Sequence, residues 1–373
     1  MTKFVLKEIT DSYIDKELEN IGFDAAYRNV AANKFHYKNI KIFNLTVAQA
    51  NILKQTALIF GADCATNRNV ITGKIELSDV ILCGSFSQLR KIADKLKSQP
   101  FKLAILGNDI INFLEEKSRK TKLVGVLNIT PNSFSDGGKY LNAEAAQKHL
   151  IQLVEDGADM IDIGAESTKP YAEAVTAAEQ ILRLKPVLEF IQKEKLEIPI
   201  SIDTRSSEVA DFALNNGVKI INDVSGFDYD SKMPEIVAKY QAGIIIQHST
   251  KKTEDKPCYN NIIEEIGFKL NEKINLAESF GIKNIIIDPG IGFGKTREDN
   301  FVILDRIKEL FYLNCPIMVG ISRKSLFGIT GEDNELKDAI SAAHSYPLIK
   351  LGIDYLRVHN VKLHKTLINS LPM

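Results

Sequence analysis

The stretch Ile285-Ile286-Ile287-Asp288-Pro289-Gly290-Ile291-Gly292-Phe293-Gly294-Lys295 decides the fold of this chain. Three consecutive β-branched residues without polar alternation are typical of a strand buried on both faces, as in a parallel sheet covered by helices. Pro289 has no backbone donor, so the strand stops at Asp288, and the glycines that follow allow the loop to approach a ligand closely. A buried strand that ends in a carboxylate and a glycine-rich loop is the building unit of the active-site face of a (β/α)8 barrel.

Seven further apolar runs of similar length precede polar or glycine-rich loops and amphipathic segments. We therefore expect eight strands that alternate with helices. This pattern indicates that residues 121–373 form a (β/α)8 TIM barrel. An open doubly wound sheet is the alternative, but no G-x-G-x-x-G follows the first strand to support dinucleotide binding. The expected strands are residues 123–127, 160–163, 198–202, 218–221, 243–246, 285–287, 317–319 and 355–358.

We predict that residues 1–118 form a separate small α/β domain of unknown role, which precedes the barrel in the sequence. The densely charged segment 115–122 is typical of a solvated linker or helix end, so we place the domain boundary there. Apolar runs in this domain indicate buried strands, and helical periodicity indicates amphipathic helices. The expected strands are residues 80–82 and 103–106, and the expected helices are residues 46–60 and 87–97.

The composition excludes several kinds of partner. Lys+Arg of 47 against Asp+Glu of 48 leave no overall charge that would attract nucleic acid or a membrane surface. No apolar run reaches the ~18 residues of a membrane-spanning helix, and the N-terminus offers none of signal-peptide length. The cysteines lie far apart without metal-ligand spacing, which indicates reduced thiols and a cytoplasmic protein. These cysteines are Cys64, Cys83, Cys258 and Cys315.

Polar side chains gather where the expected strands end. Asp223 and Thr204 each suit a simple cap, but polar groups from eight strands on one rim exceed what capping requires. One group has in-plane donors and acceptors suited to a flat, nitrogen-rich heterocycle: Asp203, Asn222, Asp288 and Lys324. A second group has the donors and the metal ligand expected around a phosphate or diphosphate: Asn128, Thr168, Arg357 and His359. We infer a substrate with an aromatic head and an anionic tail.

These loops resemble those of dihydropteroate synthase, over nearly all of residues 123–360. The resemblance implies that the protein joins (7,8-dihydropterin-6-yl)methyl diphosphate to 4-aminobenzoate in folate synthesis and releases diphosphate and 7,8-dihydropteroate. Seven segments in family order are far more specific than any single motif. They are residues 127–138, 162–170, 201–204, 220–223, 288–295, 320–328 and 357–359.

The resemblance also implies roles for individual residues. The first group would hold the pterin and the second the diphosphate, with Asn128 also a ligand of Mg²⁺. The loop 130–138 would close over the aminobenzoate subsite, sulfonamides would compete there as aminobenzoate mimics, and the protein would be a homodimer. The implied aminobenzoate residues are Phe293, Lys324 and Ser325. The implied catalytic residues are Asp288, Lys324, Arg357 and His359.

The chain departs from the family pattern at several positions. Asn132 and Asn360 stand where an Asp is usual, Gln247 where a Met is usual, and Lys169 where an Arg is usual. Lys169 keeps the charge but loses the planar fork of a guanidinium. Two alternatives therefore stay open. A methyltransferase domain that takes a methyl group from methyltetrahydrofolate uses the same barrel without a diphosphate site, and a non-catalytic pterin-binding paralogue would fit the altered first loop.

Overall fold

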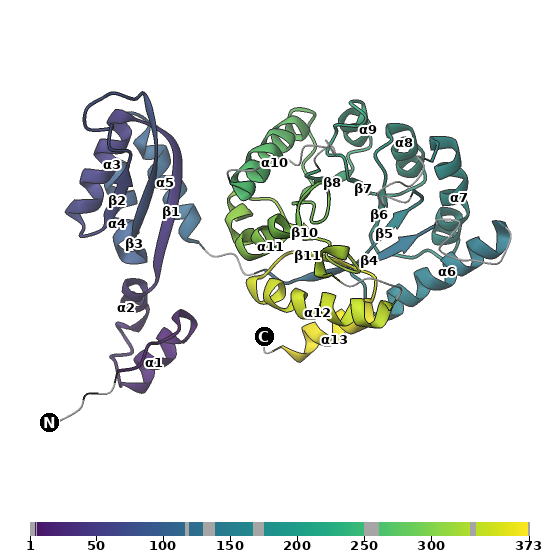
Figure 1. The fold of residues 1–373 in the computed structure, drawn as a ribbon, viewed down its shortest axis with the longest axis horizontal. Helices are drawn as coiled ribbons and strands as arrows, with labels where there is room; N and C mark the ends of the chain where they lie inside the picture. Colours follow the sequence, from purple (N-terminus) through teal and green to yellow (C-terminus); the bar gives the residue numbers. More distant parts are fainter. Residues whose placement is uncertain are drawn as a thin grey trace. The chain divides into compact units, whose positions relative to one another are not determined.

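The computed structural model describes residue 4 and residues 6–115, 119–129, 139–166, 175–249, 261–328 and 333–371, without the side chains of residues 29 and 139–142. The chain divides into two compact units, Met1–Lys117 and Ser118–Met373. Figure 1 shows a small sheet with helices in the first unit and a ring of strands surrounded by helices in the second.

A three-stranded antiparallel sheet, in the spatial order β1-β3-β2, organises the first unit. Its core consists of buried aliphatic side chains, among them Leu53, Leu82 and Leu89. The elements are η1 (Asp11–Tyr13), α1 (Ile14–Asn20), α2 (Arg28–Phe35), β1 (Tyr37–Thr46), α3 (Val47–Ile59), β2 (Asp63–Thr66), β3 (Leu77–Ser85), α4 (Phe86–Leu96) and α5 (Leu103–Leu114).

Two helices of this unit begin at capping boxes directly after a strand. The side chain of Thr46 accepts from the backbone of Gln49, whose side chain accepts from the backbone of Thr46. Ser85 and Gln88 make the same reciprocal pair at the start of α4. Each box satisfies backbone donors that a helix start leaves free. The predicted helices 46–60 and 87–97 are confirmed.

The predicted strand 103–106 is wrong, because these residues form the first turn of helix α5. The buried positions of α5 are Leu103, Gly107, Ile110 and Leu114, which follow the spacing of one helix face. A four-residue apolar run cannot separate a buried strand from one turn of a buried helix. The longer window, with its i, i+4, i+7 spacing, carries the signal that decides for a helix.

The second unit is a barrel of parallel strands, as predicted. Its eight-stranded sheet has the order β10-β11-β4-β5-β6-β7-β8-β9. An isolated parallel bridge between Ile287 and Ile317 joins the two ends of this order and closes the barrel. The strands are β4 (Lys122–Asn128), β5 (Met160–Gly164), β6 (Ile200–Asp203), β7 (Ile220–Asp223), β8 (Gly243–Gln247), β9 (Ile285–Asp288), β10 (Met318–Val319) and β11 (Tyr355–Val358).

Helices surround the strands, as Figure 1 shows. Each strand is followed by helical structure, so the chain repeats the βα unit that the sequence predicts. The helices are α6 (Lys139–Glu155), α7 (Ala177–Lys193), α8 (Ser207–Asn215), α9 (Met233–Lys239), α10 (Ile262–Ser279), α11 (Arg297–Arg306), η3 (Ile307–Leu313), η4 (Ser325–Phe327), α12 (Asn334–Leu351) and α13 (Val361–Ser370).

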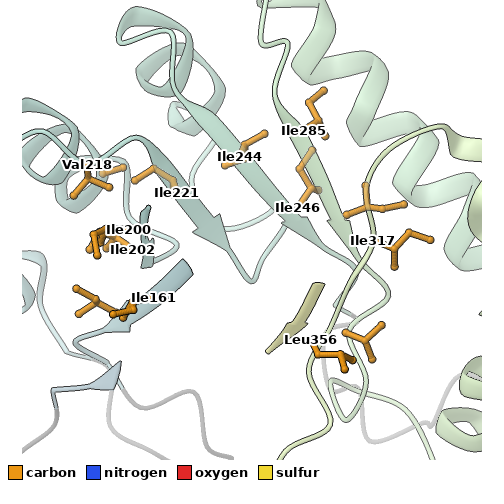
Figure 2. Close-up of a cluster of buried hydrophobic side chains, with 14 of the residues drawn as sticks. Ile161, Ile200, Ile202, Val218, Ile221, Ile244, Ile246, Ile285, Ile317 and Leu356 are labelled. Carbon is orange, nitrogen blue, oxygen red and sulfur yellow. The ribbon is translucent and has the colours of Figure 1, made fainter. Parts of the chain in front are cut away.

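Side chains along each barrel strand alternate between two layers. Outward-facing residues, among them Ile161, Ile202 and Ile244 in Figure 2, belong to the main hydrophobic core. Inward-facing residues at the amino ends of the strands form a second apolar cluster inside the barrel: Val124, Met160, Ile245, Ile286 and Met318. The inward positions nearer the carboxyl ends are polar. The interior of the barrel is therefore apolar at the amino ends of the strands and polar at their carboxyl ends. We call the polar end the mouth of the barrel.

In the described part of the chain, no helix has the length and apolar content to cross a membrane. Cys64, Cys83 and Cys315 are free cysteines, and Cys258 lies outside the described residues.

Candidate active site

Asp203 and Asn222, two of the predicted heterocycle ligands, lie on neighbouring strands at one level of the barrel, and Asn128 lies at the same level. Gly164 pairs with Asn128 on one side and with Asp203 on the other. Asp203 in turn pairs with Asn222. Asp288 comes two residues after the inward-facing Ile286, so strand alternation directs its side chain into the same mouth. The strand register thus brings these side chains to one end of the barrel.

Arg357 joins two carboxylates across this mouth. Its Nε donates to Asp162 Oδ2 at 2.7 Å, and its Nη2 donates to Asp203 Oδ2 at 3.0 Å. Asp162 is fully buried and also accepts from Ser201 Oγ at 2.6 Å and from Asn222 Nδ2 at 3.0 Å. The sequence analysis missed Asp162, although a single acid inside the apolar strand β5 marks it, because burying a charge requires partners.

Two acids share the guanidinium of Arg357, which leaves this cluster with an excess of acceptors. Burial and the nearby Asp162 together raise the pKa of Asp203 to about 7, against the opposing effect of Arg357. A ligand that brings N–H donors to Asp203 would stabilise its ionised form. The cluster is therefore suited to a nitrogen-rich heterocycle.

The loop after β9 holds Asp288 in place. The backbone N–H of Gly290 donates to Asp288 Oδ1 at 2.7 Å. Gly290 has φ +69°, and a Cβ there would lie 1.9 Å from the carbonyl oxygen of His248, so only glycine fits. Burial raises the pKa of Asp288, and the nearby cation of Lys324 is the main opposing influence.

Lys324 lies between the heterocycle ligands and the expected aminobenzoate subsite. Its Nζ donates to the carbonyl oxygen of Ile291 and lies 4.7 Å from the ring centroid of Phe293. Burial lowers the pKa of Lys324 to about 8, while Asp288 raises it. Ser325 follows as the exposed first residue of η4. Lys324 and Phe293 are therefore in contact, as a shared subsite requires, with Ser325 next in the chain.

A second buried lysine, Lys295, ties the same loop to the end of β8. Its Nζ donates to the carbonyl oxygens of Gly290 at 2.9 Å, Phe293 at 3.2 Å and His248 at 3.2 Å. Burial lowers the pKa of Lys295 to about 7. No role for Lys295 follows from the sequence, although a lysine that ends a glycine-rich loop has backbone carbonyls within reach.

His359 enters the site from the end of β11. Ser322 Oγ accepts from the backbone N–H of His359 at 3.1 Å and lies 3.0 Å from its Nδ1. Burial, with a smaller contribution from the neighbouring Arg357, lowers the pKa of His359 to about 3. The imidazole is therefore neutral at physiological pH and acts as a hydrogen-bond partner rather than as a cation.

Asn360, one of the departures from the family pattern, has a structural role. Its Oδ1 accepts from the backbone N–H of Leu363 and so caps α13. Its Nδ2 donates to Asp338 Oδ2 at 3.3 Å, beside the two bonds that Arg323 makes to the same carboxylate. An asparagine serves this cap as well as an aspartate does.

Asn128 presents its side-chain oxygen beside Gly164. A Cβ on Gly164 would lie 3.3 Å from Asn128 Oδ1 and 3.8 Å from Asp203 Oδ2. The described residues contain no group of three His, Cys, Asp or Glu side chains that could hold a metal ion. A single amide oxygen such as Asn128 Oδ1 is the kind of protein ligand that Mg²⁺ takes when phosphate and water supply its other ligands. Thr168, Asn132, Lys169 and the loop 130–138 lie outside the described residues.

Two polar residues near the rim have local structural roles instead. Asp223 faces away from the mouth and accepts from Ser225 and from the backbone of Phe227. Thr204 accepts from the backbone of Ser206 and donates to Gln180 Oε1. The interpretation of Asp223 and Thr204 as helix N-caps is wrong, because Ser206 caps α8 and Lys232 is the N-cap residue of α9. Both residues close turns instead.

A family model described as pterin binding enzyme matches residues 124–359. The dihydropteroate synthase of Clostridium beijerinckii is 43% identical over 246 residues, which cover 65% of this chain and 90% of that protein. The bifunctional dihydropteroate synthase/dihydropteroate reductase of Helicobacter pylori is 32% identical over 377 residues, 98% of this chain and 97% of that protein. A probable bifunctional folylpolyglutamate synthase/dihydropteroate synthase of Haloferax volcanii is 33% identical over 93% of this chain, which spans only 44% of that protein's length.

Solved structures resemble the barrel and cover about two thirds of this chain. Dihydropteroate synthase from Anaplasma phagocytophilum with bound 6-hydroxymethylpterin-monophosphate is 41% identical at a TM-score of 0.62, covering 67% of this chain and 97% of that one. The Xanthomonas albilineans enzyme with 4-aminobenzoic acid is 35% identical at a TM-score of 0.62, covering 68% and 94%. The Yersinia pestis enzyme in a sulfonamide drug complex is 29% identical at a TM-score of 0.62, covering 67% and 92%.

Proposed function

Because the chain belongs to the dihydropteroate synthases, transferases within the family of pterin-binding enzymes, we propose that its barrel catalyses the reaction of that family in folate synthesis. The reaction condenses (7,8-dihydropterin-6-yl)methyl diphosphate with 4-aminobenzoate and gives 7,8-dihydropteroate and diphosphate. The observation that carries the proposal is the single mouth that collects five polar side chains from separate strands and loops: Asp203, Asn222, Asp288, Lys324 and Arg357.

The pterin is assigned to Asp203, Asn222, Asp288 and Lys324. Carboxylate and amide oxygens accept from the N–H groups of the heterocycle, and the ammonium of Lys324 donates to a carbonyl or ring nitrogen. Arg357, which bonds Asp203, lies at the edge of this group. It therefore connects the pterin ligands with those of the diphosphate.

The diphosphate is assigned to Asn128, Thr168, Arg357 and His359. Arg357 keeps Nη1 for an anion, because its Nε and Nη2 already bond Asp162 and Asp203. The neutral imidazole of His359 can donate one N–H. Mg²⁺, held by Asn128 and phosphate oxygens, would supply charge neutralisation on the leaving group when bound.

Catalysis by these residues would be mainly electrostatic. Loss of diphosphate from the pterin methyl carbon leaves positive charge spread into the ring and negative charge on the leaving group. The carboxylate of Asp288 would stabilise the first, and Arg357 with His359 would stabilise the second. Aminobenzoate is a neutral aniline that needs positioning more than activation. Its site is assigned to Phe293, Lys324 and Ser325, where sulfonamides would compete.

Turnover of radiolabelled 4-aminobenzoate with the pterin diphosphate and Mg²⁺ tests this function in the purified full chain. Labelled dihydropteroate is the expected product, and a sulfonamide should reduce its formation competitively. Methyl transfer from methyltetrahydrofolate to a corrinoid would instead support the methyltransferase alternative. Pterin binding without either product would support a non-catalytic paralogue.

The match to the Helicobacter pylori protein supports a second candidate function. That match extends over both units of this chain, and the name of that protein includes dihydropteroate reductase. We therefore propose reduction of dihydropteroate as an additional activity. Oxidation of NADH or NADPH, with and without added flavin, should depend on dihydropteroate if the activity is present. A rate equal to that of a substrate-free control would exclude it for these donors.

We further propose that the protein is a homodimer, as the resemblance implies, and that it is cytoplasmic, as its widely spaced cysteines indicate. An apolar groove of about 430 Å³ between α12 and α13, lined by Ala342, Tyr346, Leu363 and Leu367, offers surface for such a contact. Sedimentation equilibrium of the full chain distinguishes a dimer from a monomer.

A further inference from the structure

Asp162 is the acceptor in each of its three side-chain hydrogen bonds within the described residues. It accepts from Ser201 Oγ at 2.6 Å, from Asn222 Nδ2 at 3.0 Å and from Arg357 Nε at 2.7 Å. A carboxylate paired with a guanidinium has acceptor sites alone. The amide of Asn222 must therefore turn its nitrogen towards Asp162 and its oxygen away.

The oxygen that results from this orientation has no protein partner. Asn222 is 1% exposed, and within the described residues its Oδ1 has no hydrogen-bond partner. A buried acceptor without a donor is costly, so it marks a place where a ligand N–H completes the site. Asp203, which pairs with Asn222 in the strand register, adds a second acceptor beside it. Two adjacent acceptors match the aminopyrimidinone edge of a pterin, which carries adjacent N–H groups.

We propose that Asp162 is a positioning residue that sets the donor and acceptor polarity of the heterocycle site through Asn222. The proposal rests on the pterin site assigned under the proposed function. Without an acceptor at position 162, nothing holds the amide nitrogen of Asn222 in this orientation, and the amide can turn over. In the turned state Asn222 directs its own N–H groups at those of the pterin, and affinity for the heterocycle falls.

Two substitutions at position 162 test this role in the full chain. Asp162→Leu removes the acceptor and should weaken binding of 6-hydroxymethylpterin by about 10-fold to 100-fold in calorimetry. Asp162→Asn keeps one oxygen for Asn222 Nδ2 and Arg357 Nε, which share Asp162 Oδ2, and can turn its nitrogen to Ser201 Oγ, so it should keep most of the affinity. Ser201→Ala is the control, since it removes a donor to Asp162 but leaves the Asn222 contact. Its pterin affinity and the KM for 4-aminobenzoate in all variants should match the wild type.

Two results would overturn the inference: Asp162→Leu that binds 6-hydroxymethylpterin like the wild type, or Asp162→Asn that binds it no better than Asp162→Leu. If Asp162→Leu does not give soluble protein, a loss of affinity of about 10-fold or more in Asp162→Asn would still overturn it. A wild-type chain that binds the pterin but forms no dihydropteroate would refute the proposed reaction alone. A wild-type chain that turns over, together with either of the two results above, would refute only the role of Asp162.

Discussion

At the scale of single residues, the mouth of the barrel holds ionisable groups whose pKa values are moved towards neutrality. Burial raises the pKa of Asp203 to about 7 and lowers that of Lys324 to about 8. An acid and a base that are shifted towards each other are typical of sites where charge must be held without water. The consequence is a narrow range of pH in which both are charged.

We expect kcat/KM for the pterin diphosphate to follow a bell-shaped pH profile with limbs near 7 and 8. Below about pH 7, Asp203 is protonated and loses an acceptor for the heterocycle. Above about pH 8, Lys324 is neutral and loses its charge. Asp203→Asn should remove the acid limb, and Lys324→Arg the alkaline limb, because a guanidinium stays charged. Unchanged limbs in both variants would assign them to the substrate instead.

Asp288→Asn should lower kcat by about 10²-fold to 10³-fold, because it removes the negative charge proposed to stabilise the cationic pterin. Steady-state kinetics with both substrates measures this. Asp223→Asn is the matched control, since Asp223 is also a buried acid at a strand end but accepts only local donors. It should reduce stability and leave kcat intact. Equal loss of kcat in both variants would show a general effect of removing a buried acid.

Lys295→Met should raise the KM for 4-aminobenzoate more than that for the pterin diphosphate. The change leaves three carbonyl oxygens without their donor and frees the segment that carries Phe293. We expect the free energy of unfolding to fall by about 2 kcal/mol or more. Lys269→Met, on the exposed face of α10, is the control for loss of charge. Equal changes in both KM values would argue against a specific role at the aminobenzoate subsite.

The residues of the candidate site that lie at the ends of strands were predictable from the sequence. Asp203, Asn222, Asp288 and Arg357 lie where a buried run stops, so the sequence pattern alone brings them to one rim. Asp162 lies inside a strand, and its partners come from three other strands. Which donors surround a buried acid depends on register and side-chain rotamers, and these do not appear in the sequence pattern.

At the scale of elements, the eight barrel strands are predictable because each is a short apolar run between breaking residues. The run 103–106 has the same composition but belongs to a helix whose other buried positions lie further along the chain. Composition therefore predicts burial in both cases. Only the spacing over three turns separates helix from strand.

Gly107→Ala should loosen the packing of α5 on α4. A Cβ at Gly107 would lie 2.5 Å from the carbonyl oxygen of Ala93, a backbone atom that cannot move freely. We expect a loss of about 1–3 kcal/mol, seen as faster hydrogen exchange of both helices in the full chain. Gly267→Ala is the control, because there the Cβ meets the hydroxyl end of the Tyr312 side chain, which can rotate away. Similar exchange in both variants would contradict the packing argument.

At the scale of the whole molecule, the barrel should work without the first unit. The Clostridium beijerinckii relative matches only 65% of this chain yet 90% of its own length. A chain of residues 118–373 should therefore keep kcat within about 3-fold of the full chain. A folded barrel without turnover would show that the first unit contributes to the reaction.

The start of this shortened chain matters. Arg119 Nη1 donates to Asp354 Oδ2 at 2.5 Å, and its guanidinium lies 4.4 Å from the ring of Phe311. A chain that begins at residue 123 loses both contacts and the first residue of β4, and it should melt at a lower temperature than one that begins at residue 118. Thermal unfolding of the two chains separates this local effect from loss of the first unit.

The bridge between Ile287 and Ile317 has a mechanical consequence. β8 and β9 pair at four positions, whereas this one bridge joins β9 to the segment before the two-residue β10. The seam therefore has the fewest strand pairs in the wall, and we expect backbone hydrogen exchange to be fastest along it. Asp288 ends one side of the seam, and Lys324 follows the other. The attraction between this anion and this cation therefore acts across the line where the backbone pairing is weakest.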